Sequence, residues 1–383
     1  MSAPSAQLPP DAAGLYVHVP FCQVKCSYCG FYSEPVACHD SDRLVSTLIT
    51  EMDRYCRVAS IKTIYIGGGS PTALPVSLLA RLLDAVTSRW PHTCEFTVEC
   101  NPGQTNEQVL PVLRDAGVTR LSFGVQSFDE SELALLGRRH NVDDAVRSVH
   151  QAREFGFDNI GIDLIFAIPG STLDAWQHSL SRAVELDVRH ISAYSLSFEE
   201  GTPLHEARAA GGVEAVDEET DRAMYELAID YLASQSFAQY EISNFARDGY
   251  ACIHNRGYWD NRPYIGIGPS AGSYWQGGRT LNVPDIQEYI CRIETGSDAH
   301  EQIEHPDVNQ RICETAVLNL RKRNGISLAQ FEETTGANFA DVFGEPMDRY
   351  VDQGLMEVNG DAVRLTRDAL PVADSVLCDF SAI

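Results

Sequence analysis

Basic residues are scarce in this chain. Lys and Arg total 29 against 54 Asp and Glu, so the formal net charge is −25. Such a surface repels phosphate backbones, so we expect no nucleic-acid partner. It also provides no general attraction for anionic lipid, although the composition is compatible with a local basic patch.

Long hydrophobic runs are absent too. No uninterrupted apolar stretch approaches the roughly 18 residues that a membrane-spanning helix needs. Residues 1–13 contain no Lys or Arg and no apolar core, so they match neither a secretory signal nor a twin-arginine signal. We therefore expect a cytoplasmic protein whose residues 1–13, rich in Pro and Ala, form a disordered tail.

Cysteine, by contrast, is plentiful, with 11 residues. Three of them, Cys22, Cys26 and Cys29, form a C-x3-C-x2-C motif directly after a short apolar alternation over 14–19. The other eight are scattered and are expected to be reduced thiols in a reducing cytosol.

Three close thiols favour an iron–sulfur cluster. Thiolates are soft ligands for zinc, copper(I) and iron–sulfur clusters. Three cysteines leave one iron of a [4Fe–4S] cube without a protein ligand, whereas a structural zinc normally takes four ligands. The spacing therefore favours an open-site cluster, while a zinc site completed by a distant His or Cys, a redox thiol pair and chance are the alternatives.

From residue 14 short apolar strands alternate with amphipathic helices. We expect strands at 14–19, 62–66, 95–99, 120–124, 159–164 and 190–196, and helices at 40–57, 75–88, 105–116, 129–137, 142–155 and 173–187. A helix after each strand predicts right-handed crossovers and a parallel sheet. Six such units are fewer than a closed eight-fold barrel needs.

Polar residues follow several of these strands. They are Gly67 to Ser70, Glu99 to Asn101, Gln126, Ser127, Asp163 and Tyr194. The carboxyl ends of barrel strands build active sites, so we expect a site there. The plain alternative is that strand ends are polar in any protein.

The second half of the chain is less regular. We expect an acidic loop at 200–215, a helix at 218–235, an edge strand at 238–242 and an aromatic, glycine-rich segment at 252–282. The tail predicts helices at 308–322, after 326–327 and at 345–354, and then a hairpin turning at Asn359-Gly360. Residues 301–383 carry 7 Lys/Arg and 15 Asp/Glu (7 − 15 = −8). This winged-helix-like module is thus expected to be a structural or protein-contact lid and not a DNA-binding wing.

The cysteine motif, with Tyr28 before its last cysteine and Gly67-Gly68-Gly69 after the second strand, resembles the radical S-adenosylmethionine (SAM) superfamily. That resemblance implies an open (β/α)6 partial TIM barrel, with a small winged-helix-like α+β domain behind it. It also implies that SAM chelates the open iron through its amino and carboxylate groups and is cleaved to a 5′-deoxyadenosyl radical. The expected division is a tail at 1–13, a radical SAM core at 14–240, a connecting segment at 241–300 and a C-terminal domain at 301–383.

Further motifs narrow the resemblance. YVHVPFC, GGGSPT, ECNP, SFGVQSF, IDLIFAIPG and HNRGYW closely resemble the oxygen-independent coproporphyrinogen III oxidase group, over about residues 14–370. The true oxidases carry a fourth cysteine, C-x3-C-x2-C-x-C, where this chain has Phe31, and a longer N-terminal extension. Both departures match the haem-chaperone branch of the group.

The resemblance carries over roles residue by residue. Cys22, Cys26 and Cys29 are the implied cluster ligands. The implied SAM-binding residues are Tyr16, Tyr28, Gly68, Gly69, Ser70, Glu99, Gln126, Arg138 and Asp163. Ser70 stands where the group usually has Thr. Plain alternatives are helix capping for Glu99 and Asp163, and a surface salt bridge for Arg138.

His254 in HNRGYW is the candidate haem ligand. Imidazole is the commonest axial ligand of haem, and Tyr258, Trp259 and Tyr264 would give a porphyrin flat apolar walls. The oxidases share this kind of segment, so the alternative is that it positions the barrel in both branches. His18, beside the cluster loop, is expected only to support that loop.

The first functional hypothesis is a haem chaperone that binds haem, a [4Fe–4S] cluster and SAM and passes haem to respiratory or other haem proteins. The resemblance is compatible with peripheral association at the inner membrane surface and with a homodimer. The second hypothesis is an enzyme, oxygen-independent coproporphyrinogen III oxidase, which forms protoporphyrinogen IX. A third is radical chemistry on another tetrapyrrole.

Overall fold

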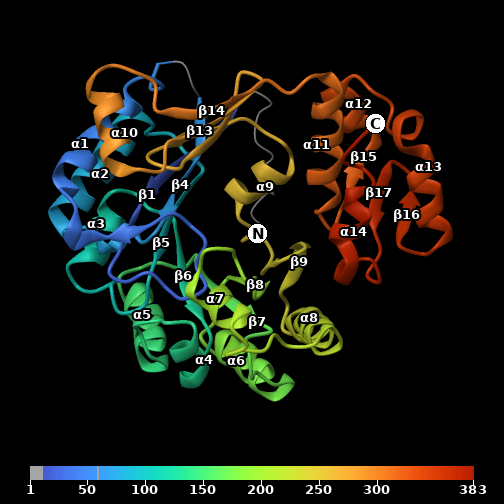
Figure 1. Cartoon of the computed structure of the whole chain (residues 1–383), viewed down its shortest axis with the longest axis horizontal. Coiled ribbons are helices and arrows are strands. Elements are labelled where there is room, and N and C mark those ends of the chain that lie inside the picture. Colours follow the sequence, from blue (N-terminus) through green and yellow to red (C-terminus); the bar gives the residue numbers. More distant parts are fainter. Residues whose placement is uncertain (1–11, 58–59) are drawn as a thin grey trace.

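The computed structural model describes residues 12–57 and 60–383 (Figure 1). Six parallel strands form the predicted partial barrel, and neighbours in the sequence are neighbours in the sheet. They are β1 (Ala13–Val19), β4 (Ile61–Gly68), β5 (Glu95–Cys100), β6 (Arg120–Gln126), β7 (Ile160–Phe166) and β8 (His190–Ser195). The tail expected at 1–13 lies mostly outside the described residues, but Ala12 and Ala13 are buried.

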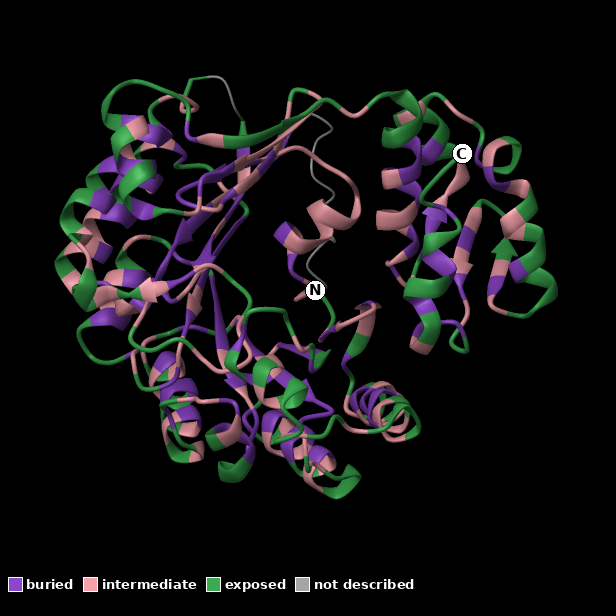
Figure 2. Cartoon of the chain, viewed as in Figure 1, coloured by how far each residue is buried: buried purple, intermediate pink, exposed green. Residues whose placement is uncertain are grey.

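Helices cover the outer face of this sheet (Figure 2). They are α1 (Ser41–Met52), α2 (Val76–Arg89), α3 (Val109–Asp115), α4 (Glu130–Leu135), α5 (Val142–Glu154) and α6 (Leu173–Glu185). Side chains such as Asp129, Asn141 and Thr172 cap their first turns by accepting backbone N–H bonds. All six helices were predicted; α1, α3 and α4 are shorter than expected.

The two faces of each strand have different chemistry. Leu15, Val17 and Val19 of β1 are fully buried under the helices. Tyr16 and its counterpart Tyr65 in β4 project to the other face, into the barrel, because strand side chains alternate. The apolar core is thus the outer layer, and the barrel interior is left polar.

The segment expected to connect the two domains instead extends the sheet. It contains α9 (Ile253–Trp259), β11 (Tyr264–Ile267), β12 (Gly272–Trp275), β13 (Gly278–Asn282), α10 (Ile286–Glu294) and β14 (His300–Glu304). Strand β11 pairs in parallel with β1, and β12 to β14 follow as antiparallel strands. Gly266 lies so close to the next strand that a Cβ there would be 2.1 Å from the carbonyl oxygen of Gly272. Glycine is uncommon inside strands, so the sequence did not indicate a strand here.

The opposite edge of the sheet holds the predicted edge strand. β9 (Ala238–Glu241) pairs with β10 (Asn244–Ala246), which pairs with β8. Helix α8 (Glu218–Ser234) precedes it as predicted. The loop expected at 200–215 was wrong in part, since it contains α7 (Pro203–Ala209), with Thr202 as N-cap and proline in the first turn.

Three C-terminal helices and the hairpin follow the prediction, whereas a two-residue strand before the second helix and a last helix were not predicted. In chain order the elements are α11 (Val308–Leu320), β15 (Ile326–Ser327), α12 (Leu328–Thr335), α13 (Phe339–Asp352), β16 (Met356–Asn359), β17 (Ala362–Leu365) and α14 (Ala373–Cys378). Helix α13 begins earlier than predicted and is kinked at Phe343, three residues before Pro346. Lys322 reaches back to Asp260 just after α9, with an Nζ–Oδ1 distance of 2.6 Å.

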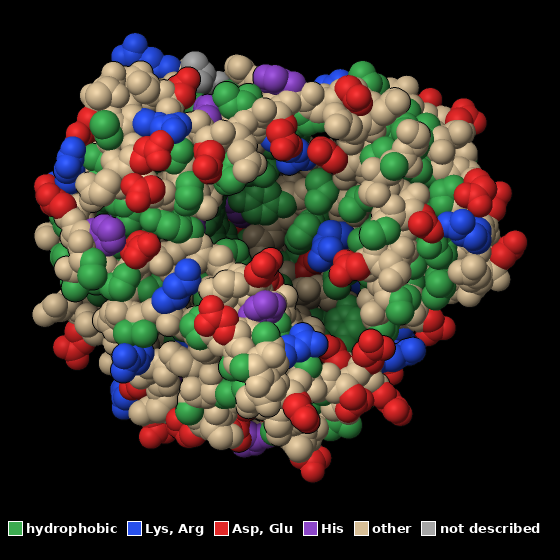
Figure 3. Space-filling view, viewed as in Figure 1, with side chains coloured by type: hydrophobic (Ala, Val, Ile, Leu, Met, Phe, Trp, Pro, Cys, Tyr) green, Lys and Arg blue, Asp and Glu red, His purple; other side chains and the backbone are tan. Residues whose placement is uncertain are grey.

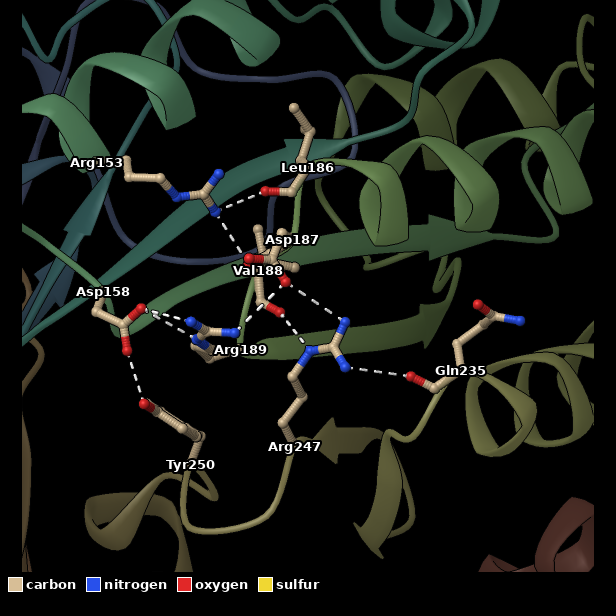
Figure 4. A network of polar contacts seen from close by, with 9 residues as sticks. All are labelled: Arg153, Asp158, Leu186, Asp187, Val188, Arg189, Gln235, Arg247 and Tyr250. Carbon is tan, nitrogen blue, oxygen red and sulfur yellow. Dashed lines mark hydrogen bonds and ion pairs between the residues drawn. The ribbon is translucent and has the colours of Figure 1, made fainter.

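A polar network fastens the loops before β7 and β8 (Figure 4). Arg189 contacts Asp158 at 2.6 Å, and Tyr250 donates to the other oxygen of the same carboxylate at 2.6 Å. Arg247 donates to the carbonyl of Val188.

Acidic side chains are spread over the face seen in Figure 3, which is hollowed near its centre. Over 12–57 and 60–383, no helix has both the length and the apolar character needed to cross a bilayer.

Candidate functional site

The cluster loop lies directly after β1. It begins in β2 (Phe21–Cys22), which pairs with β3 (Glu34–Pro35). Ser27, at the centre of the loop, bonds through its amide and its hydroxyl to the carbonyls of Leu136 and Leu135 at the end of α4. The amide of Leu204 in α7 donates to the Ser27 carbonyl at 2.8 Å. The unpredicted helix α7 therefore helps to fix the loop.

One cavity of about 660 Å³ brings the predicted residues together. Its lining includes all three motif cysteines and every predicted SAM-binding residue, namely Cys22, Cys26, Cys29, Tyr16, Tyr28, Gly68, Gly69, Ser70, Glu99, Gln126, Arg138 and Asp163. Of the other strand-end residues, Cys100, Asn101 and Tyr194 also line it. Ser127 is fully buried and bonds to Glu132 of α4, so it belongs to the helix start.

The glycine loop is packed too tightly for side chains. A Cβ on Gly69 would lie 2.5 Å from the Phe21 carbonyl oxygen and 3.0 Å from the Cys22 sulfur. Gly68 has φ of +112° and lies against the ring of His18. That ring bonds to the Tyr32 carbonyl at 3.0 Å and to the Tyr16 hydroxyl at 2.9 Å. His18 thus supports the cluster loop, as the sequence predicted.

Glu99 contacts the glycine loop from inside the barrel. Its carboxylate accepts from the Tyr65 hydroxyl at 2.8 Å and from the Gly68 amide at 3.2 Å, so it caps no helix. Burial raises the pKa of Glu99 to about 7, because desolvation outweighs these two bonds. Near pH 7 this carboxyl therefore exchanges between its protonated and ionised forms, and a cationic neighbour would stabilise the ionised form.

Arg138 joins the cluster loop to the strands. Its guanidinium lies 3.4 Å from the Cys26 sulfur, donates to Asn101 Oδ1 at 2.7 Å and contacts the Gly124 carbonyl. These partners lie in the cavity wall. The alternative of a surface salt bridge for Arg138 therefore does not hold. Gln126 ends β6 with φ of +71°, an uncommon conformation for a non-glycine residue that points to a functional constraint.

Asp163 lies deeper in the barrel. It accepts from Ser192 at 2.6 Å and, more weakly, from Ser122 at 3.4 Å. Burial raises its pKa above the ordinary value. Like Glu99, it faces the cavity and caps no helix, so both are available to polar groups of a ligand.

His254 lies outside the cavity lining. It is 3% exposed in α9, and both ring nitrogens are hydrogen-bonded, Nδ1 to Thr63 Oγ1 at 2.9 Å and Nε2 to the Tyr258 hydroxyl at 2.8 Å. Burial lowers its pKa to about 3, so the ring is neutral. A haem ligand needs a free nitrogen, so this geometry favours the alternative role of positioning β1 and β4.

Several lining residues were not singled out from the sequence. Tyr65, Arg120, Ser122 and Ser192 line the same cavity from the middle and the start of their strands. The available signal was the two-residue period of a strand, because Arg120 and Ser122 share the face of Gly124 and Gln126. Only strand ends were considered, so these positions were overlooked.

The residues present fit an iron–sulfur cluster. The three cysteines are half-buried free thiols around one cavity, and Arg138 supplies positive charge beside one of them. Burial raises the pKa of the Cys22 and Cys29 thiols, so they are protonated in the metal-free protein and lose their protons on metal binding.

Comparison with known families agrees with this chemistry. The radical SAM superfamily profile matches residues 16–183, and the HemN C-terminal domain profile matches residues 307–372. Coproporphyrinogen III oxidase (HemN) from Escherichia coli, a radical SAM enzyme, shares the fold. Its TM-score is 0.84 over 97% of this chain and 91% of that one, at 21% sequence identity.

Sequence relatives define the branch. Heme chaperone HemW of Bacillus subtilis is 35% identical over 95% of this chain and 98% of its own length. HemW of Lactococcus lactis is 33% identical over 95% of this chain and 96% of its own length. The chain therefore belongs to the HemW family of radical SAM proteins.

Proposed function

We propose that this protein is a haem chaperone that binds haem and delivers it to acceptor haem proteins, including respiratory ones. The observation that carries this proposal is Phe31. It occupies the position of the oxidases' fourth cysteine, lines the cavity and has 72% of its surface exposed. An exposed aromatic ring at a cavity mouth suits a flat apolar ligand.

The cavity residues have separate roles in this proposal. Cys22, Cys26 and Cys29 hold the cluster, which supplies an open iron for SAM when bound. Glu99 pairs with the SAM ammonium group, and Arg138 pairs with its carboxylate in a bidentate way. Asp163 and Gln126 bind ribose hydroxyls, while Tyr16, Tyr28, Gly68, Gly69 and Ser70 shape the pocket.

The cellular location and the partners of the protein are also part of the proposal. The acidic surface supports a cytoplasmic protein without nucleic-acid partners. Delivery to respiratory haem proteins would take it to the inner membrane surface as a peripheral protein, and a homodimer is the oligomer we expect. Pull-down by a haem-requiring membrane enzyme, lost when haem is omitted, would support this placement.

The second candidate function is coproporphyrinogen III oxidation. The polar cavity residues that favour it are the same ones that bind SAM in the first proposal. The test is a paired assay on anaerobically reconstituted protein. Coproporphyrinogen III, SAM and a reductant are supplied, and protoporphyrin and 5′-deoxyadenosine are measured beside a haem titration.

We expect haem binding at a one-to-one ratio and no protoporphyrin. Phe31→Cys, which restores the fourth cysteine, is the matched variant, and we expect it to bind haem more weakly and to form no protoporphyrin. Protoporphyrin formed in step with 5′-deoxyadenosine would overturn the chaperone proposal. Absence of haem binding in the wild-type protein would do the same.

A further inference from the structure

Arg120 is a buried cation at the amino end of the barrel. It begins β6, is 1% exposed and lines the cavity from below. In the described structure its Nε and Nη1 atoms are buried and have no hydrogen-bond partner. Burying a charged group without a partner is costly, so a ligand that completes its hydrogen bonds would offset that cost.

Other unpaired polar atoms lie on the strands that flank it. Thr97 in β5 is the strand-register partner of Arg120, and its Oγ1 has no hydrogen-bond partner in the described residues. His190 in β8 has an unpaired Nδ1 atom there. A Cβ on Gly161 in β7 would lie 2.9 Å from Arg120 Nη2 and 3.4 Å from His190 Nδ1. Glycine at 161 therefore leaves room beside the guanidinium.

The nearby carboxylates interact with the Arg120 charge through space, but their hydrogen bonds are made to other groups. Glu95 accepts the Ile253 and His254 amides at the start of α9, at 2.9 and 2.8 Å, and the Cys252 thiol. Asp163 accepts from Ser192 and Ser122. Within residues 12–57 and 60–383, no carboxylate oxygen lies within 4 Å of an Arg120 nitrogen as an ion pair.

We propose that Arg120 binds a carboxylate of a ligand that occupies the lower part of the cavity. SAM is an unsuitable source, because its carboxylate is required at the cluster. The seven residues from Arg120 to Gln126 span about 20 Å of strand, so the two ends are far apart. Resting on the proposed function, the carboxylate is assigned to a propionate of the bound tetrapyrrole.

The test compares haem with its dimethyl ester, which keeps the ring and iron and lacks the charges. Both are titrated into the reconstituted wild-type protein, Arg120→Gln, Arg120→Lys and the control Arg189→Gln. Arg189 lies at the same end of the barrel, on the outside, paired with Asp158. We expect wild type and the control to bind haem about 10- to 100-fold more tightly than the ester. Arg120→Gln should lose that preference, and Arg120→Lys should retain part of it.

The wild-type comparison needs no variant, so it stands even if Arg120→Gln fails to fold. Equal wild-type affinity for haem and ester would overturn the propionate subsite and leave the chaperone proposal intact. A preference that persists in a folded Arg120→Gln protein would also overturn it. A loss of SAM affinity without a change in the haem preference would reassign Arg120 to SAM. Failure of wild type to bind either porphyrin would overturn the proposed function itself.

Discussion

The carboxyl and amino ends of the barrel interior are built from the same strands, but their polar groups have different surroundings. At the carboxyl end the three motif cysteines, Gly69 and Glu99 line an open cavity, and the Glu99 carboxylate bonds to Tyr65 and Gly68 within it. At the amino end Glu95 and His254 are fully engaged with α9 and Thr63. The carboxyl end is arranged to bind, whereas the amino end holds α9 against the strands and presents to the cavity one cation, Arg120, whose Nε and Nη1 atoms have no hydrogen-bond partner among the described residues. The predictions below test that contrast.

The largest effect is expected at the cluster loop. Replacing Cys22, Cys26 and Cys29 by Ser should abolish cluster absorbance and bound iron, because no thiolate ligands remain. Iron analysis and visible spectra after anaerobic reconstitution measure this. Cys94→Ser, an exposed thiol outside the cavity, is the control and should keep the cluster. A triple variant with a full cluster would contradict the ligand assignment.

At the amino end, His254→Ala should destabilise the fold by about 3 kcal/mol. The change leaves two buried hydroxyl partners, on Thr63 and Tyr258, without the imidazole and opens a cavity. Urea unfolding measures it, with exposed His92→Ala as the control. If stability is unchanged while haem affinity collapses, His254 is a haem ligand and the contrast between the two ends fails.

Gly69→Ala should weaken SAM binding about 10- to 100-fold. Its Cβ would meet the Phe21 carbonyl and the Cys22 sulfur, so the cluster loop must shift. Equilibrium binding of SAM to the reconstituted protein is the measurement. Gly212→Ala, where the nearest atom is 3.4 Å away, should have no effect on SAM binding. Equal SAM affinities in the two variants would show that the glycine loop does not contact SAM.

The pH dependence of SAM binding should follow Glu99. The pKa of Glu99 in the free protein is about 7, so its carboxylate is protonated at lower pH and the SAM ammonium loses its partner. Affinity should fall about tenfold per unit below pH 7 and level off above it. Glu99→Gln should bind weakly at every pH, which separates Glu99 from Asp163. A steep pH profile in that variant would assign the titration to another group.

The smallest effect is expected in α9 itself. Gly257→Ala introduces a Cβ that meets no atom within 4 Å, inside a helix. It should stabilise the protein by about 0.5–1 kcal/mol, because alanine is the better helix former. Thermal unfolding measures it, with cluster and SAM binding unchanged. A loss of SAM binding would show that α9 also serves the carboxyl end.

The sequence was informative wherever one local rule decided the structure. Apolar alternation located the six barrel strands, and the Asn359-Gly360 turn located the hairpin with φ of +61° at Gly360. Motif spacing brought the cysteines and the SAM residues to one cavity. The sequence-based prediction failed where a contact between residues far apart in the chain determines the local structure. Glycine is needed at 266 in β11 because the backbone of Gly272 packs against it, and the environment of His254 depends on Thr63, 191 residues away.

The pairing of β11 with β1 has a consequence for the timing of assembly. Gly14 pairs with Tyr264, so the strand that delivers the cluster loop gains its second neighbour only after some 250 further residues have been made. During synthesis on the ribosome, β1 is an edge strand with β4 as its one possible partner. Contacts of such long sequence separation form late and slowly. We therefore expect cluster insertion to follow the emergence of β11 from the ribosome.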